Sequence, residues 1–423
     1  MFPPIAGAGV QRPLKFIKYL PEYGINPIVF CPYKAYWKTY DAKLLDLPFL
    51  KHIPIFRCGI KKLQRYYHLR YKKGYKFHPY FYILGLRFFF YLDIFSAWYF
   101  ECRQQALKIA KNEHIDCVLT TSPPHSTHFF GRFLKKKAEI PWVMDIRDAI
   151  YDDPNRLETM IARFQAPIRL WCEKRFFPLS DAIVSVSDPI IESINNRHRT
   201  QKLESKSWTI TNGFDDEDFA HIPLDKKSRQ YLLISYTGSF LAKRTPEKFL
   251  DAIRFLIEKK AIDPGDLRIR FIGNFDDNIL SIFQRFSAQM PIEIHGFQPY
   301  EKSLNHQVNS DLLLLIGGAD TKEGASQIMT GKIYEYIGAR RPVFALVPDG
   351  PLKDLIKKGH FGTVTPPDDV SQIANGFLSV YRQWKKNGTI SYAPDLNLRN
   401  QFSRKCLTEK LAAVVRNAVH GER

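Results

Sequence analysis

Short apolar runs alternate along the chain with longer segments in which apolar residues recur at helical spacing. In the clearest unit, the apolar run 312–316 is followed by a polar loop, a helical segment at 331–339 and a second apolar run at 343–347. Such runs between helical segments are typical of buried strands in a parallel sheet. Further strands are expected at 27–30, 117–121, 141–144, 182–187, 208–212, 231–237, 268–272, 292–294 and 362–364. The pattern predicts an α/β fold.

The chain has 423 residues, which is long for a single hydrophobic core and predicts two domains of about 200 residues each. We place an N-terminal domain at residues 1–222, a C-terminal domain at 223–385 and a final helical segment at 386–423. Hydrophobic residues make up 45% of the chain, as is usual for a soluble globular protein.

Polar residues at the start of the helix expected at 331–339 suit a nucleotide. Thr330 is a good N-cap before Gly331, and a helix N-terminus with free backbone N–H groups attracts phosphate. Lys332 adds a positive charge, and Glu335 follows on the same face, where a carboxylate can accept hydrogen bonds from a sugar diol such as ribose. The alternative is an ordinary Lys–Glu pair on a solvated helix.

Glycine turns follow the strands expected in the second domain. Gly238 and Ser239 come directly after the first of them, and Lys243 and Arg244 precede the next helix. Backbone N–H groups and two cations at such a turn form a suitable site for pyrophosphate. Gly273 ends the next strand, as expected where backbone lines a nucleotide pocket.

Three loops of the first domain carry candidate chemistry. Gly7 and Gly9 form a tight turn before a helix, the segment 121–128 reads TSPPHSTH, and DIRD follows at 145–148. The last two loops follow strands of one parallel sheet, so they should lie at the same edge. The structural alternative is a solvated histidine and a surface ion-pair network.

These motifs and their order resemble the GT-B glycosyltransferases, especially the large retaining group called family 4. GKIYEYIGARRPVFAL at 331–346 is similar to the family's donor-binding helix, and NGFD at 212–215 is similar to the end of its first domain. The family carries two glutamates eight positions apart. Glu335 matches the second, and Gln327 stands in place of the first.

The resemblance implies a GT-B fold, with two Rossmann-like domains facing across a cleft and a C-terminal helix returning to the first domain. It also implies transfer of a hexose from UDP-, GDP- or another nucleotide diphosphate sugar to a hydroxyl acceptor, a glycan or lipid-linked sugar. Retention of anomeric configuration, independence of metals and cofactors, and a place in cell-surface polysaccharide or glycolipid synthesis are expected on the same ground.

Site residues are assigned by the same resemblance. The expected catalytic residues, from the first-domain loops, are His125, Asp145, Arg147 and Asp148. The expected donor-binding residues are Gly7, Gly9, Gly238, Ser239, Lys243, Arg244, Gly273, Gln327, Thr330, Gly331, Lys332 and Glu335. In this family a strand immediately precedes the glycine loop, whereas here only six residues precede Gly7, so we expect the first domain to lack its first strand.

Positive charge is concentrated near the N-terminus. Of the net charge of +19, a large part lies in residues 1–100, which hold 16 Lys and Arg against four Asp and Glu. The stretch 60–100 interleaves these cations with Tyr and Phe, and its longest uncharged run has ten residues, whereas a membrane span needs about 20. It suits an anionic membrane surface. The alternative is an inserted helical region that packs its aromatic rings into the first domain.

Six cysteines are scattered without a C-x-x-C pair, which argues against a disulfide framework or a zinc site and for a reducing compartment. No signal peptide is visible. We therefore expect a cytoplasmic protein that associates peripherally with the inner face of the plasma membrane.

Two other functions remain open. A GT-B sugar-nucleotide 2-epimerase would use the same donor pocket without an acceptor. A non-enzymatic nucleic-acid-binding protein is suggested by the charge, although no recognised binding motif supports it.

If the stretch 60–100 docks on lipid, the protein should co-sediment with vesicles that contain anionic lipid and release as salt is raised, because charge attraction is screened. Neutral vesicles of the same size serve as the control. Equal recovery on neutral and anionic vesicles would contradict the electrostatic part of this prediction.

Overall fold

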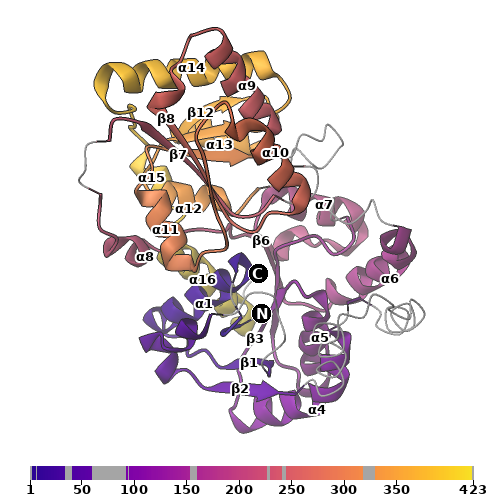
Figure 1. The fold of residues 1–423 in the computed structure, drawn as a ribbon. Coiled ribbons are helices and arrows are strands. Elements are labelled where there is room, and N and C mark those ends of the chain that lie inside the picture. Colours follow the sequence, from indigo (N-terminus) through magenta and orange to yellow (C-terminus); the bar gives the residue numbers. More distant parts are fainter. Residues whose placement is uncertain are drawn as a thin grey trace, which may run out of the picture. The chain divides into compact units, whose positions relative to one another are not determined.

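A computed structural model describes most of the chain, namely residues 2–5, 7–33, 41–59, 92–93, 95–152, 160–225, 229–240, 244–317 and 329–421. The chain divides into two compact units, both drawn in Figure 1. Unit 1 comprises Met1–Thr211 with Lys405–Arg423, and unit 2 comprises Asn212–Arg404.

The domain boundaries that we expected after residues 222 and 385 lie inside unit 2. Backbone pairing explains the difference. The Phe214 N–H donates to the Phe402 carbonyl (3.1 Å), and the Arg404 N–H donates to the Phe214 carbonyl (2.7 Å). Both stretches therefore belong to unit 2, although no local sequence pattern marks a pairing of such distant segments.

Unit 2 contains a six-stranded parallel sheet in the order β12-β11-β10-β7-β8-β9. Its strands are β7 (Leu232–Thr237), β8 (Leu267–Ile272), β9 (Ile292–His295), β10 (Leu312–Ile316), β11 (Val343–Leu346) and β12 (Gly362–Thr365). The chain runs from β7 outward to β9 and then returns to place β10 on the other side of β7. This is the Rossmann order, in which ligands bind where the direction reverses, here at the carboxyl ends of β7 and β10.

Helices cover both faces of this sheet. One face carries α9 (Glu247–Glu258), α10 (Asp277–Ser287) and α14 (Val370–Asn387), and the other carries α11 (Tyr300–Val308), α12 (Lys332–Gly338) and α13 (Pro351–Lys358). Two short helices, α8 (Asp216–Ala220) and α15 (Leu396–Asn400), complete the unit.

The uninterrupted apolar run of β10 follows from this arrangement. Successive side chains of a strand point to opposite faces, so Leu312 and Leu314 enter one core while Leu313 and Leu315 enter the other. A strand covered on both faces must be apolar throughout, which is why the sequence predicted it well.

Unit 1 contains two sets of parallel strands. One set is the four-stranded sheet β3 (Val118–Ser122), β4 (Trp142–Ile146), β5 (Ala182–Ser185) and β6 (Ser207–Thr209), and the other is the pair β1 (Val29–Pro32) and β2 (Ile55–Cys58). The helices are α1 (Ala8–Tyr19), α4 (Ser96–Asn112), α5 (His128–Ala138), α6 (Met160–Phe176), α7 (Asp188–Arg197) and α16 (Arg404–His420). In the described part of the chain, no strand precedes α1.

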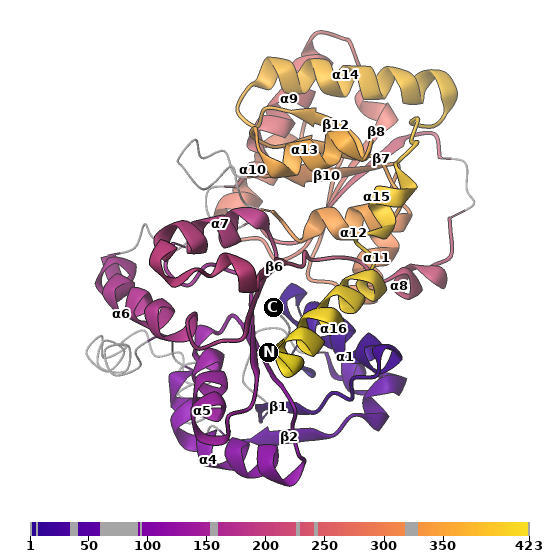
Figure 2. The same ribbon diagram turned by 180° about the vertical axis from the view of Figure 1, so that it is seen from behind.

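The C-terminal helix α16 belongs to unit 1 and lies beside α1 in both views of Figures 1 and 2. Leu407 and Leu411 are fully buried against Phe16 of α1 and against Val143 and Val184 of the four-stranded sheet. Burial of two leucines stabilises the fold by about 2–3 kcal/mol each, which explains how this distant segment is retained in the first unit.

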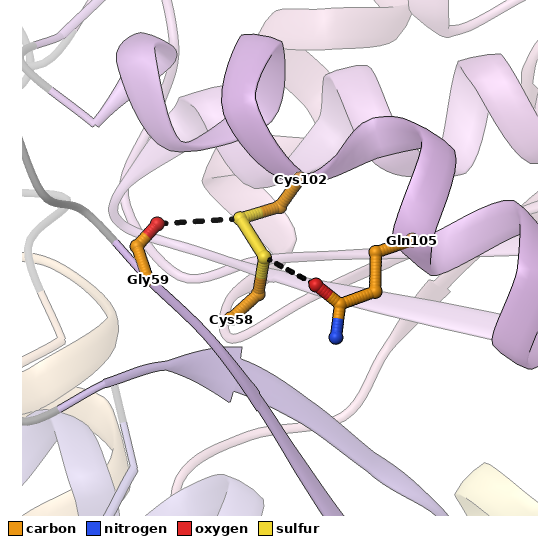
Figure 3. Close-up of a disulfide and its surroundings, with 4 residues drawn as sticks. All are labelled: Cys58, Gly59, Cys102 and Gln105. Carbon is orange, nitrogen blue, oxygen red and sulfur yellow. Dashed lines mark hydrogen bonds between the residues drawn. A yellow bond between two sulfur atoms is a disulfide. The ribbon is translucent and has the colours of Figure 1, made fainter.

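A disulfide joins Cys58, at the end of β2, to Cys102 in α4, as Figure 3 shows. The scattered cysteines argued against a disulfide, and for this pair the argument was wrong. The two residues are 44 positions apart and meet because the end of β2 packs with α4 in one apolar cluster. Since disulfides are uncommon in reducing compartments, the cysteines no longer support a cytoplasmic location.

Three of our sequence predictions fall on residues outside the described ranges: Lys243, Gln327 and most of the basic aromatic stretch 60–100. Within the described ranges, no helix is long and apolar enough to cross a membrane.

Candidate functional site

Two glycine loops meet beside the reversal point of the unit 2 sheet, at the carboxyl ends of β7 and β8. Gly238 follows β7 with a φ of 111°, and Gly273 follows β8 with a φ of 156°, conformations that favour glycine. The Gly238 N–H donates to the carbonyl of Ile272 (2.7 Å), and a Cβ on Gly273 would lie 2.3 Å from the Gly238 oxygen. The two loops therefore pack backbone against backbone, which only glycine permits at these positions.

Lys332, the first residue of α12, extends over this loop. Its Nζ donates to the hydroxyl of Tyr236 (2.5 Å), and it lies 3.4 Å from the Ser239 carbonyl oxygen and 4.2 Å from the centre of the Tyr236 ring. A Cβ on Gly238 would come within 2.5 Å of Lys332 Cε. Gly238 thus leaves room for the ammonium group to lie against the end of β7.

Arg244 supplies a second positive charge close to Lys332. Burial, followed by the charge of Arg244, lowers the pKa of Lys332 to about 7, with Glu335 opposing the shift. Burial also lowers the pKa of Arg244. Like charges in a poorly hydrated place disfavour each other, so an anion with two negative charges would relieve the repulsion. Of the basic pair expected here, Arg244 is described and Lys243 is not.

Glu335 places a carboxyl group one turn beyond Lys332. Burial raises its pKa, while a hydrogen bond from Gln307 and the charges of Arg404 and Lys332 act in the opposite direction. The Gln307 bond joins Nε2 to Glu335 Oε2 at 3.2 Å. The site therefore combines cations with an oriented acceptor for hydroxyl groups.

The start of α12 differs from the expectation. Gly331, not Thr330, occupies the N-cap position, and no side chain caps the helix. Thr330 contributes its carbonyl, which accepts from the Ile333 N–H (3.3 Å), so its expected capping role is wrong because the helix starts one residue later. With seven residues, α12 aligns few peptide dipoles. An anion would therefore be attracted mainly by the side-chain charges of Lys332 and Arg244.

In unit 1 the carboxylate of Asp145 accepts hydrogen bonds from Arg12 and Thr121. Arg12 donates to it from Nε (3.1 Å) and Nη2 (2.8 Å), and the Thr121 hydroxyl donates at 2.7 Å. Burial tends to raise the pKa of Asp145, but Arg12, Arg147 and Thr121 outweigh it, and the pKa lies below its ordinary value. At 1% exposure, this ionised carboxylate ties β4 to α1 and β3.

The guanidinium of Arg147 binds backbone carbonyls. Its donors reach the oxygens of Ser122 (2.9 Å), Pro123 (2.9 Å) and Gly9 (2.5 Å). Arg147 thereby joins the loop after β3 to the first turn of α1, where Gly7 is the N-cap residue with a φ of 115°. The expected loops do gather at one sheet edge, and Asp145 and Arg147 hold them together.

His125 and Asp148 differ in their accessibility. His125 is 1% exposed, in a loop whose next residue, Ser126, donates its N–H (2.9 Å) and hydroxyl (2.7 Å) to Asp93. Asp148 is exposed. Of the four expected catalytic residues, Asp148 is therefore the one whose side chain is most open to solvent in unit 1.

Three residues of these sites escaped the sequence reasoning: Arg12, Tyr236 and Gln307. Arg12 carries a weak signal at most, because its helix also contains Lys15 and Lys18 and the sequence does not show which of these cations is the most deeply buried. Tyr236 and Gln307 carry none, because each belongs to an ordinary strand or helix pattern. Among the described residues, no group of three His, Cys, Asp or Glu side chains is placed to hold a metal ion.

No protein-family model and no curated protein sequence matches the chain. Solved structures do match it. HepE from Anabaena, solved in complex with UDP and glucose, has a TM-score of 0.61 at 13% identity, with 97% of this chain and 96% of that chain covered. A glycosyltransferase from Rickettsia africae has a TM-score of 0.58 at 14% identity, with 100% and 98% covered.

A protein from Listeria monocytogenes with the provisional name UDP-N-acetylglucosamine 2-epimerase has a TM-score of 0.59 at 10% identity, with 99% and 96% covered. At these identities, similarity shows the fold and leaves the activity to be argued from the site. The chain has the GT-B fold, two Rossmann-like units in one polypeptide, as its motifs implied.

Proposed function

We propose that the protein is a glycosyltransferase that binds a nucleotide diphosphate sugar in unit 2 and moves the sugar to a hydroxyl acceptor. The observation that carries the proposal is the convergence of Lys332, Arg244 and Glu335 at the reversal point of the unit 2 sheet. Two cations suit a diphosphate, and the carboxylate suits the hydroxyls of a ribose.

The reaction explains why two cations would be placed there. When the glycosidic bond breaks, negative charge grows on the oxygen of the departing diphosphate. Positive groups that are fixed before the reaction stabilise that charge without reorganisation, and their contribution can reach several kcal/mol. Lys332 is fixed in this way by Tyr236 and the Ser239 carbonyl.

Unit 1 would handle the acceptor. In this proposal Arg147 and Asp145 position the three loops, and the exposed Asp148 is the residue best placed to meet a ligand. The same proposal includes retention of anomeric configuration and independence of metals. It also includes a role in cell-surface polysaccharide or glycolipid synthesis and attachment to the inner membrane face. They rest on the resemblance of the motifs and on the basic stretch 60–100.

A sugar-nucleotide 2-epimerase is the second candidate, favoured by the structural match to the Listeria protein. Both reactions need the same donor site, so binding measurements do not separate them. Product analysis does, since a transferase releases free nucleotide diphosphate when an acceptor is present, whereas an epimerase returns the nucleotide still joined to a sugar.

Arg244→Ala should weaken binding of UDP or GDP by about 10–100-fold, because a charge-assisted hydrogen bond to phosphate contributes about 1.5–3 kcal/mol. It should also lower kcat, since the charge matters most as the leaving group departs. Asp148→Asn in unit 1 should leave nucleotide affinity unchanged. Calorimetric titration of each variant measures the affinities.

Arg254→Ala is the matched control, because this arginine pairs with Asp251 on the surface of α9. It should bind nucleotide like the unaltered protein. Loss of nucleotide binding in Asp148→Asn together with normal binding in Arg244→Ala would show that the donor site has been assigned to the wrong unit.

Glu335→Gln should make the unliganded protein more stable at pH 7 while weakening nucleotide binding. The pKa of Glu335 is raised in the folded state, so ionised Glu335 destabilises the fold once the pH exceeds that pKa, and a neutral amide removes this cost. The gain in Tm should shrink as the pH falls to about 4, below the ordinary glutamate pKa of 4.5, where the carboxyl group is mostly protonated in both states. Thermal unfolding at both pH values tests this, and a lower Tm at pH 7 would contradict it.

A further inference from the structure

Gln307, in the last turn of α11, donates a side-chain hydrogen bond to Glu335 and is itself completely buried. Its Nε2 donates at 3.2 Å to Glu335 Oε2 and at 3.1 Å to the hydroxyl oxygen of Thr237, the last residue of β7. One amide therefore connects the candidate ribose-binding carboxylate to the central strand of the sheet.

The far end of this connection is rigid. The Thr237 N–H donates to the Tyr336 hydroxyl (3.1 Å), and that hydroxyl donates to the carbonyl of Leu314 in β10 (3.2 Å). Tyr336 and Leu314 are buried. The end of β7 is thus joined by hydrogen bonds to the middle of β10, and Thr237 presents its oxygen to Gln307 from a fixed place.

These bonds also set the orientation of the Gln307 amide. Both N–H groups of Nε2 have acceptors, and one of these is a carboxylate. Rotation of the amide by half a turn would place Oε1 against Glu335 Oε2, oxygen against oxygen. The observed orientation leaves Oε1 buried with no hydrogen-bond partner in the described structure, a cost that an apolar side chain at this position would avoid.

We propose that Gln307 is a positioning residue that turns the carboxylate of Glu335 towards the two hydroxyls of a nucleotide ribose, so that the protein's preference for ribonucleotides depends on Gln307. The inference rests on the proposed function and deepens it. A carboxylate recognises a vicinal diol when its plane is held in register with both hydroxyls, and a buried amide with a fixed orientation supplies that constraint.

A purely structural role for Gln307 makes a different prediction. A cross-link between α11 and α12 would affect all nucleotides alike, whether or not they carry ribose hydroxyls. A positioning role affects only the part of the affinity that comes from those hydroxyls. The ratio of affinities for a nucleotide and its 2′,3′-dideoxy form therefore separates the two roles.

The test compares the unaltered protein with Gln307→Met, which keeps the length of the side chain and removes the amide. Calorimetry measures the affinities for UDP and 2′,3′-dideoxy-UDP, or for the GDP pair if the protein binds GDP instead. The unaltered protein should prefer the ribonucleotide by about 10–100-fold, the range for hydrogen bonds to a charged group. In Gln307→Met the preference should fall to within a few-fold, while the affinity for the dideoxy form stays nearly constant.

Two further variants make the comparison sharper. Thr237→Val removes the hydroxyl that accepts from the Gln307 amide and leaves the Gln307–Glu335 hydrogen bond in place. It should reduce the preference for the ribonucleotide by a smaller factor than Gln307→Met does. Ser310 lies just after α11, and its buried hydroxyl donates to the Ser235 hydroxyl (2.7 Å). Ser310→Ala removes this hydroxyl. It should leave both affinities unchanged.

The outcomes distinguish this inference from the proposed function. If the unaltered protein binds the ribo and dideoxy forms equally, Glu335 does not bind the ribose hydroxyls, and the assignment of Glu335 in the proposed function fails. If it discriminates but Gln307→Met discriminates equally well, or loses affinity for both forms by the same factor, the proposed function stands and the role of Gln307 is refuted.

Discussion

The loops after β7 and β8 approach so closely that backbone contacts backbone, and the candidate site of unit 2 depends on this contact. The Gly273 position has no room for a Cβ against the Gly238 carbonyl, and Gly238 leaves the space that the Lys332 side chain fills. With Lys332 in place, its ammonium group lies on the Tyr236 ring at the edge where the strand order reverses. Backbone conformation at two positions therefore determines where the positive charge is presented.

The charged groups of this site are not arranged for stability. Burial disfavours the ionised forms of Lys332, Arg244 and Glu335 alike. Bound ligand of opposite charge would compensate the cations, and hydroxyl donors would compensate the carboxylate. The unit 1 cluster is different, because Asp145 and Arg147 have their partners within the protein and lock three loops together. The two carboxylates show the difference most plainly, because the arginine partners of Asp145 hold its pKa below the ordinary value, whereas burial raises the pKa of Glu335.

The sequence predicted the strands of unit 2 well, since a run such as 312–316 must be apolar on both faces of a covered parallel sheet. It also predicted that Lys332 and Glu335 lie close together, because residues three apart on a helix share a face. It could not reveal contacts made by packing distant elements: Arg12 with Asp145 over 133 positions, Cys58 with Cys102 over 44, and Gln307 with Glu335 over 28. The Rossmann-like organisation of unit 2 was implied by the resemblance of motifs, because periodicity does not give the order of strands in a sheet.

The most direct test of the central claim, that an anionic nucleotide binds on Lys332, is to count the protons taken up when UDP binds at pH 8. Calorimetry in two buffers with different ionisation enthalpies gives this number. Because the pKa of Lys332 is lowered to about 7, its amine is mostly neutral at pH 8, and a diphosphate that recruits the charged form should draw in up to about one proton per nucleotide. Lys332→Arg, which stays charged, should bind without this uptake. Binding of UDP to the unaltered protein at pH 8 with no proton uptake would contradict the account.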